Sequence, residues 1–429
     1  MHHCRTCLAL ALGLGLLTAG CGGGGGGSSS STTETVTTTT STSQTTTSAP
    51  LNSASNTTVV PVVVVNPVVP PVVTVAGDPL AGLTADLLTK FQNGRTAFLK
   101  NEQGEARFGP LFNGNSCVQC HNAGAPGGAG VIQVTRFGKV TNNVFDPLTN
   151  EGGTVLQALS LPGRAREVVP LDANVRTNRR TTSVMGAGLV EAIPDSAIVD
   201  NAKLQLAANP LQAGQLNFVT SLSDGAVHVG RFGWKCQHAF LLDFSADAYA
   251  NEMGVSSALV PSENVANAAP RAIPLDQVED RPDATGLRNV DRFTDFMRLL
   301  APPPTKAAVP QGERTFTSIG CVVCHHPSFG TVSTIPALNG KTVNAYSDFL
   351  LHDVGTGDGI EQTPAPANKI RTAPLMGVSA QPSFLHDGSA RTITAAILAH
   401  GGEATSSRQA FQALSGDDRQ SLLDFLNSL

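Results

Sequence analysis

Cys117-Val118-Gln119-Cys120-His121 and Cys321-Val322-Val323-Cys324-His325 are two copies of one pentapeptide pattern, C-x-x-C-H. This pattern is the attachment signature of c-type haem, in which both thiols bond to the haem vinyl groups and the histidine ligates the iron. A single C-x-x-C would also suit a dithiol redox pair or half of a zinc site. Two complete copies, in a chain with only 8 cysteines and 10 histidines, favour two covalently attached haem c groups.

The N-terminus has the layout of a bacterial export signal. An apolar run of Leu, Ala and Gly over residues 8–17 is too short to cross a bilayer comfortably. Cys21 follows two small residues, as in lipoprotein signals, although Thr18 stands where leucine is usual. We therefore expect residues 1–20 to be a signal peptide and Cys21 to carry a lipid anchor to the membrane, with plain secretion as the alternative. Both routes predict the periplasmic face of a bacterial cell envelope.

Residues 21–77 are of low complexity: a glycine run, a Ser/Thr-rich stretch, and then valines interrupted by prolines. Such a composition buries little apolar surface, and proline removes the backbone donors that a central strand needs. We expect a tether, flexible at first and stiffer in its Val/Pro part, that holds a globular body away from a membrane.

The rest of the chain is long enough for two globular domains. Gly94-Arg95-Thr96-Ala97-Phe98 precedes the first haem motif, and the similar Gly312-Glu313-Arg314-Thr315-Phe316 precedes the second. A proline-rich stretch at residues 301–304 separates the two halves. We therefore predict an N-terminal haem domain over residues 78–300 and a C-terminal cytochrome c-like haem domain over residues 305–429.

Helical patterns dominate this body. Apolar residues recur at helical spacing over residues 84–99 and again after Ser415, which is placed to cap the last helix, whereas strand-like alternation is scarce. The formal net charge is only −5, and no basic run points to a nucleic-acid partner. The sequence therefore predicts a mainly α-helical protein that does not bind nucleic acid.

Several strings outside the haem motifs resemble the bacterial di-haem c-type oxidoreductase family, sometimes labelled thiol oxidoreductases. They are Phe108-Gly109-Pro110-Leu111-Phe112-Asn113, Gly188-Leu189-Val190-Glu191-Ala192-Ile193-Pro194, Gly230-Arg231-Phe232-Gly233-Trp234-Lys235, Leu350-Leu351-His352-Asp353, Leu385-His386-Asp387-Gly388 and Ala395-Ala396-Ile397-Leu398-Ala399-His400-Gly401-Gly402-Glu403-Ala404. That family is remotely similar to the di-haem cytochrome c peroxidases. The resemblance implies two cytochrome c-like haem domains in the arrangement found in those peroxidases.

The resemblance also implies that electrons enter at the C-terminal haem, with His325 as one iron ligand. We expect His400 to be the sixth ligand, because it lies fourteen residues after His386, at the interval where the peroxidases carry a ligating methionine. Histidine in that place predicts a low reduction potential. The alternatives are that His400 only caps carbonyl groups at a helix end, or that Met376 or His352 is the ligand.

The N-terminal haem lacks an obvious sixth ligand. The peroxidases carry a displaceable histidine soon after their first motif, but here no histidine occurs between His121 and His228. This departure predicts an open or water-bound iron. His228, His238 and Met253 are the other possible ligands.

Two residues are expected to serve this open haem. Asn251-Glu252-Met253-Gly254 resembles the peroxidase segment whose glutamate assists cleavage of the O–O bond, so Glu252 is the acid/base candidate and Glu191 a weaker one. Trp234, the only tryptophan, resembles a residue that relays electrons between the peroxidase haems. The plainer alternatives are a solvated helix-end carboxylate for Glu252 and a packing role for Trp234.

Together these inferences predict a di-haem oxidoreductase supplied by a small electron-donor protein, such as a cytochrome c or a blue copper protein. Electrons would pass from the C-terminal to the N-terminal haem, which would reduce an oxidant, with hydrogen peroxide favoured. Two other functions stay open: an electron-transfer protein without a substrate, and a peroxide-driven oxidase that modifies a partner protein. Cys236, the cysteine left over in the body, is expected to be buried and unreactive.

Overall fold

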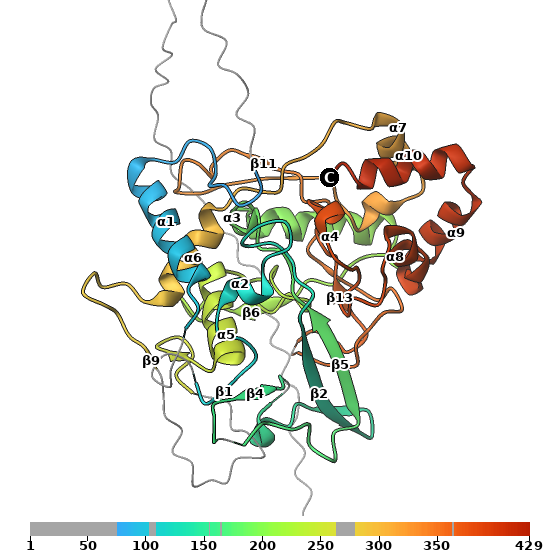
Figure 1. The fold of residues 1–429 in the computed structure, drawn as a ribbon. Coiled ribbons are helices and arrows are strands. Elements are labelled where there is room, and N and C mark those ends of the chain that lie inside the picture. The colour runs from blue at the N-terminus through green and yellow to red at the C-terminus, as the bar shows by residue number, and fades with distance from the viewer. Residues whose placement is uncertain (1–74, 103–108, 154, 164, 263–278, 363) are drawn as a thin grey trace, which may run out of the picture. The chain divides into compact units, whose positions relative to one another are not determined.

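The computed structural model describes residues 75–102, 109–153, 155–163, 165–262, 279–362 and 364–429, which lie within one compact unit of the chain, residues 70–429 (Figure 1). The predicted signal peptide, Cys21 and nearly all of the predicted tether lie outside the described residues. Within the described part, no helix is both long enough and apolar enough to cross a membrane.

The unit combines ten α-helices with short sheets in its described residues. The ribbon of β2 (Gln133–Thr141) and β5 (Val175–Arg180) and the pair of β1 (Leu111–Phe112) and β4 (Leu159–Ser160) lie at its lower edge in Figure 1. The α-helices are α1 (Ala85–Leu99), α2 (Cys117–Cys120), α3 (Ala187–Glu191), α4 (Asp195–Ala208), α5 (Leu241–Met253), α6 (Asn289–Leu299), α7 (Pro310–Ser318), α8 (Ile393–Ala399), α9 (Thr405–Ala413) and α10 (Gly416–Leu426). The 3₁₀ helices are η1 (Thr149–Glu151), η2 (Cys321–Val323), η3 (Val378–Ala380) and η4 (Gly402–Ala404).

The two helices predicted with a defined start are confirmed. The Thr84 hydroxyl accepts a hydrogen bond from the backbone N–H of Leu87 and begins α1. The Ser415 hydroxyl does the same for the N–H of Asp418, at 3.1 Å, and begins α10. Each cap satisfies a backbone donor that has no partner inside the helix.

The repeated strings mark the same structural unit in both halves. Gly94 lies where α1 crosses α6, and a Cβ atom there would collide with the backbone of α6. Gly312 of α7 lies in the same way against α10. Phe98 and Phe316, four residues after each glycine, are buried and pack on the histidine of the adjacent haem motif, at ring-centroid distances of 6.1 and 6.3 Å. Both glycines therefore allow the close helix packing that places an aromatic ring beside each motif.

The strands pair mostly in twos. β2 (Gln133–Thr141) lies between β3 (Val144–Asp146) and β5 (Val175–Arg180), and all three run antiparallel to their neighbours. The other pairs are β1 (Leu111–Phe112) with β4 (Leu159–Ser160), β6 (Phe218–Thr220) with β7 (Val227–Val229), β8 (Ser256–Ser257) with β9 (Glu279–Asp280), β10 (Phe329–Gly330) with β11 (Thr342–Val343), and β12 (Leu351–His352) with β13 (Ile370–Arg371).

The prediction of a mainly helical protein is therefore only partly right, since helices form 33% of the structure. Most strands are two or three residues long and cannot produce a readable alternation. The longer ribbon of β2 and β5, visible at the bottom of Figure 1, was missed because polar residues occupy both of its faces.

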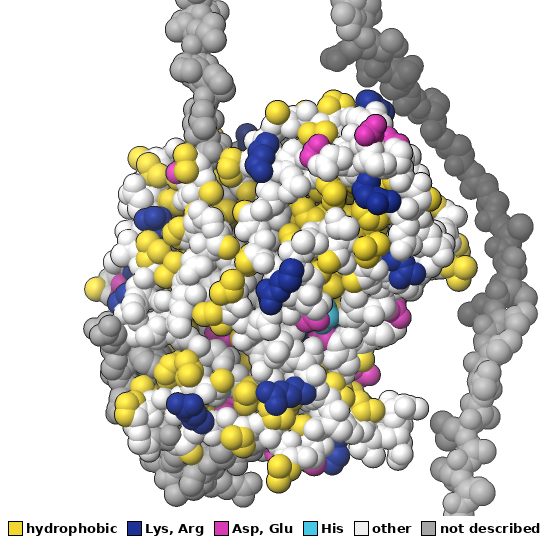
Figure 2. All heavy atoms as spheres, turned by 45° about the vertical axis from the view of Figure 1, so that its right-hand side comes forward, with side chains coloured by type: hydrophobic (Ala, Val, Ile, Leu, Met, Phe, Trp, Pro, Cys, Tyr) yellow, Lys and Arg dark blue, Asp and Glu magenta, His cyan; other side chains and the backbone are white. Residues whose placement is uncertain are grey.

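Charged side chains are sparse on the surface, in keeping with a charged fraction of 14%. On the face shown in Figure 2, Lys and Arg side chains are scattered, and some of them lie beside Asp or Glu side chains.

Candidate haem sites

The first C-x-x-C-H motif lines a cavity in the N-terminal half. One turn of helix, α2, places Cys117 and Cys120 on the same side, and His121 ends that turn. The cavity holds about 1160 Å³ of empty space, including the solvent at its mouth. Burial lowers the pKa of His121 to about 4, so the ring is neutral at pH 7, which is the state that binds a metal. The apolar part of the lining comprises Phe98, Val134, Tyr249, Met253, Phe293 and Met297.

The second motif lines a similar cavity in the C-terminal half. Cys321, Cys324 and His325 border about 1430 Å³ of empty space, measured in the same way. The Nδ1 atom of His325 lies 2.9 Å from the carbonyl oxygen of Tyr346, and burial lowers the pKa of this histidine to about 4. A neutral ring that donates from Nδ1 to this carbonyl leaves the lone pair on Nε2, the usual state of an iron-ligating histidine. The aliphatic walls include Ile370, Leu375, Ile393, Ile397, Leu422 and Leu426.

His400 lines the same cavity as His325. It ends α8, and its Nδ1 atom lies 2.7 Å from the carbonyl oxygen of Ala396. The capping contact weighed from the sequence is thus present, but it uses only Nδ1 and leaves Nε2 for another partner. Burial lowers the pKa of His400, so this ring is also neutral at pH 7. The cavity therefore receives two neutral imidazoles from separate segments of the chain.

Both cavities fit a c-type haem. Each offers two thiols about one helical turn apart, a neutral imidazole on the next residue, and mostly apolar walls. The buried guanidinium groups of Arg180 and Arg371 also line the C-terminal cavity, and they donate to the backbone carbonyls of Leu385 and Gly233. These two cations suit the carboxylates that a haem carries. Arg231, in contrast, pairs with Asp195 outside both cavities.

Glu252 lies at the end of α5 and lines the N-terminal cavity together with the first motif. Its Oε2 atom accepts a hydrogen bond from Nδ2 of Asn113, at 2.9 Å. Burial raises the pKa of Glu252, while Arg136 and Asn113 counteract that effect. Asp247, one turn earlier on α5, lines the same cavity, but its pair with His238 at 3.2 Å keeps its pKa low despite burial. The two carboxyl groups are thus driven toward different protonation states.

Trp234 lines both cavities, and Arg180 does so as well. The indole Nε1 donates to the backbone carbonyl of Arg180 at 3.0 Å, and the Arg180 guanidinium lies 5.3 Å from the centre of the ring. His386 packs edge-on against the indole, with ring centroids 6.3 Å apart. The next residue, Lys235, is fully buried and donates from Nζ to three backbone carbonyls, those of Pro366, Ala367 and Lys369. This anchoring fixes the indole between the two haem motifs.

Of the other candidate ligands, some lie outside the two cavities and one already contacts carboxylates through both ring nitrogens. His228 lies between Asp195 and Asp224, at 3.3 and 3.0 Å, and lines neither cavity. Met253 does line the N-terminal cavity, whereas Met376 borders a smaller hollow beside Trp234. His352 borders the C-terminal cavity, but carboxylates lie against both of its ring nitrogens. Glu191, the weaker acid/base candidate, pairs with Arg298 and lines neither cavity.

Sequence reasoning missed the partners that hold these side chains. Asn113 lies in a string quoted for the family resemblance, but its contact with Glu252 spans 139 residues and leaves no local signal. The contact of His352 with Glu403, 51 residues away, was missed for the same reason. Asp348 is only four residues from His352, but nothing in the sequence shows that the two side chains face each other.

Cys236 is buried, as expected, and its thiol donates to the carbonyl oxygen of Phe349 at 3.2 Å. Burial raises its pKa to about 12, so almost no thiolate forms near neutral pH. A thiol-based activity thus has no support at this residue.

We expect Cys236 to resist alkylation in the folded protein. Peptide mapping after iodoacetamide treatment at pH 7.5 should find this cysteine unmodified in native protein and fully modified after denaturation. Rapid labelling of the native protein would show that the thiol is reachable and acidic, contrary to its surroundings.

Comparison with known proteins gives one family. A sequence model described as "Di-haem oxidoreductase, putative peroxidase" matches residues 167–429, a range that contains the second motif, Trp234, Glu252 and His400. The first motif precedes that range. No curated protein matches the chain significantly.

Three solved structures are distantly similar, each at 14% sequence identity. The hydrazine synthase of Kuenenia stuttgartiensis matches 83% of this chain and 90% of its own, with a TM-score of 0.36. A MauG-like protein associated with microbial copper homeostasis matches 83% of this chain and 93% of its own, with a TM-score of 0.35. The diheme peroxidase BthA from Burkholderia thailandensis matches 80% of this chain and 86% of its own, with a TM-score of 0.37.

Proposed function

Because the chain belongs to the di-haem oxidoreductase family, we propose that it is a peroxidase-like enzyme with two covalent haem c groups. Electrons from a small redox protein, a cytochrome c or a blue copper protein, enter at the C-terminal haem and reach the N-terminal haem, where hydrogen peroxide is reduced. The difference between the two cavities supports this assignment most directly. His400 joins His325 in one, whereas Glu252 is placed with His121 in the other.

Each C-x-x-C-H motif would hold one of the two haems. Cys117, Cys120 and His121 would hold the N-terminal haem, and the second motif would hold the other with His400 as sixth ligand. The haems supply the electrons and an iron at which peroxide is reduced.

Glu252 moves the proton in this proposal. Its carboxylate takes the proton from the near peroxide oxygen and returns it to the departing one, which leaves as water. Asn113 holds one carboxylate oxygen in place, at 2.9 Å. Asp247, whose pKa is low beside His238, stays ionised. Glu252 has a raised pKa, so of the two carboxyl groups it is the one suited to carry the proton. Reduction of one peroxide to two waters consumes two electrons and two protons.

Trp234 provides the packed connection between the two cavities. Trp234 and Arg180 line both cavities, and the Arg180 guanidinium lies 5.3 Å from the centre of the indole, so these two side chains would lie on a path for electrons between the haems. We also propose that residues 1–20 act as an export signal and that Cys21 carries a lipid anchor, so that the enzyme works on the periplasmic face of the cell envelope.

Peroxide titration of the fully reduced, haem-loaded protein under anaerobic conditions tests the proposal. One equivalent of peroxide should oxidise both haems rapidly, because the protein then holds the two electrons that the reaction needs. A protein that stays reduced on the same time scale would be an electron carrier without an open haem.

A further inference from the structure

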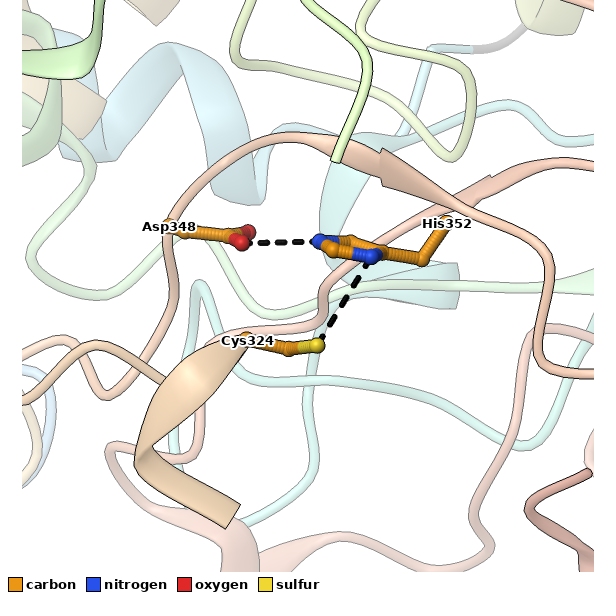
Figure 3. Close-up of side chains that lie close together, drawn as sticks. All are labelled: Cys324, Asp348 and His352. Carbon is orange, nitrogen blue, oxygen red and sulfur yellow. Dashed lines mark hydrogen bonds and ion pairs between the residues drawn. The ribbon is translucent and has the colours of Figure 1, made fainter. Parts of the chain in front are cut away.

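His352 of β12 lies between two carboxylates beside the second haem motif. Its Nε2 atom is 2.8 Å from Oδ2 of Asp348, as Figure 3 shows, and its Nδ1 atom is 2.6 Å from Oε2 of Glu403. The side chains of His352 and Asp348 are at most 2% exposed. Burial alone would favour a neutral ring, but the carboxylates outweigh it and raise the pKa of His352 to about 12. The ring is therefore an imidazolium that donates from both nitrogens.

This arrangement does not suit a metal ion. Cys324, Asp348 and His352 bring ligand atoms within 4.8 Å of one another, and the sulfur lies 3.6 Å from Nδ1 of the histidine. Figure 3 shows the three side chains facing one another. However, a metal needs a nitrogen lone pair, and both ring nitrogens already carry protons directed at carboxylates. Cys324, moreover, is one of the two thiols of the haem motif.

One carboxylate lies on a loop that contacts the segment of His325, and the other lies on the turn that follows His400. Asp348 follows Tyr346, the acceptor for His325, by two residues, and its backbone N–H donates to the carbonyl of Cys324 at 2.9 Å. Glu403 follows His400 by three residues, in η4. The charged side chains of Asp348, His352 and Glu403 thus connect the loop that contacts His325 to the turn that follows His400.

Several other contacts also fix the turn after His400. Gly401 donates to the carbonyl of Val354 at 2.7 Å, and Glu403 exchanges backbone and side-chain hydrogen bonds with Asp353. Lys369 adds an ion pair to the second carboxylate oxygen of Glu403, at 3.1 Å. The contacts with Val354 and Asp353 join the turn to the segment after His352, and Nε2 of Gln212, which follows α4, donates to the carbonyl oxygen of Glu403 at 3.0 Å. The imidazolium adds the charged contact that continues across to Asp348 and the proximal loop.

We infer that His352 is a positioning residue that holds the His400 turn opposite His325, so that both histidines can bind one iron. The inference rests on the proposed ligation by His400. A protonated ring is suited to this role because it donates two charge-assisted hydrogen bonds in nearly opposite directions. Removing it leaves two carboxylates facing each other across a buried gap, which drives the segments apart.

The test is the spin state of the C-terminal haem in His352→Gln, measured by low-temperature EPR on oxidised, haem-loaded protein. Glutamine carries no charge, and both of its donor hydrogens are on one nitrogen, so it cannot reproduce the two nearly opposite hydrogen bonds of the imidazolium. We expect the C-terminal haem to lose most of its low-spin signal, with new high-spin intensity in its place. His228→Gln is the matched control, because His228 also lies between two carboxylates but borders neither cavity, and it should keep the wild-type spectrum.

Further variants distinguish a failure of the inference about His352 from a failure of the proposed ligation by His400. A folded, haem-loaded His352→Gln protein with the wild-type spectrum would overturn the inference. If His400→Ala also left the low-spin signal intact, the proposed ligation itself would be wrong. Should His352→Gln fail to load haem, Glu403→Gln gives the answer, since it removes the charge that His352 and Lys369 share on the His400 side and leaves the pair of His352 with Asp348 in place. We expect it to shift the low-spin signal, and an unchanged signal in that variant would equally contradict the inference.

Discussion

Replacing Glu252 with glutamine should lower the peroxide turnover by about 10²- to 10⁴-fold, the usual contribution of a positioned acid/base group. Glutamine has nearly the same shape and can still accept the hydrogen bond from Asn113, so the cavity should keep its structure. It cannot take up a proton at neutral pH, however, and the transfer between the two peroxide oxygens loses its carrier. Steady-state turnover with a reduced donor, at saturating peroxide, measures the effect.

The role of Glu252 also predicts how turnover should change with pH. Burial raises the pKa of Glu252 above its ordinary value of 4.5, and the ionised form must be present to accept the peroxide proton. Turnover should therefore fall as the pH drops through that raised pKa, at a higher pH than an exposed carboxyl would give. The Glu252→Gln variant should lack this acidic limb.

Glu191→Gln is the matched control, because Glu191 was the weaker acid/base candidate. Its carboxylate pairs with Arg298 and lines neither cavity. This variant should retain wild-type turnover. Loss of turnover in Glu191→Gln, with Glu252→Gln unaffected, would reverse the assignment of the two glutamates.

Replacing His400 with methionine should raise the midpoint potential of the C-terminal haem by on the order of 0.1–0.3 V, part of the ~0.8 V range that axial ligands set. A thioether ligand raises the potential relative to an imidazole. The N-terminal haem, in the other cavity, should keep its potential. A spectroelectrochemical titration that resolves the two haems measures both values.

Met376→Leu is the control for this titration, because Met376 was a rival ligand. It borders the smaller hollow beside Trp234 rather than the cavity of His325 and His400. Its replacement should leave both potentials unchanged. An unchanged potential in His400→Met, together with a shift in Met376→Leu, would exchange the roles of these two residues.

The parts that could be predicted from the sequence are those with a local signal. The C-x-x-C-H pattern needs only five consecutive residues, and each copy indeed borders a cavity of haem size. The glycine of each repeated string reflects a helix crossing, and the phenylalanine four residues later reflects packing on the motif histidine. The cap at Ser415 was visible for the same reason, because a cap acts within three residues.

What could not be predicted depends on contacts between distant segments. Strands of two residues, such as β12 and β13, exist because their partner is nearby in space rather than because of their own pattern. His352 was weighed as a rival ligand, since a histidine in sequence gives no sign of its neighbours. Only the fold shows that carboxylates at positions 348 and 403 lie against its two nitrogens. Asn113 and Glu252 are a similar pair.

The central claim is that the two haems differ, one held by two histidines and the other open beside Glu252. EPR and optical spectra of the fully oxidised, haem-loaded protein, recorded before and after addition of hydrogen peroxide, test it most directly. The account predicts one low-spin haem that peroxide leaves unchanged and one high-spin signal that peroxide consumes. Two low-spin haems that do not respond to peroxide, in this state and after partial reduction, would contradict it.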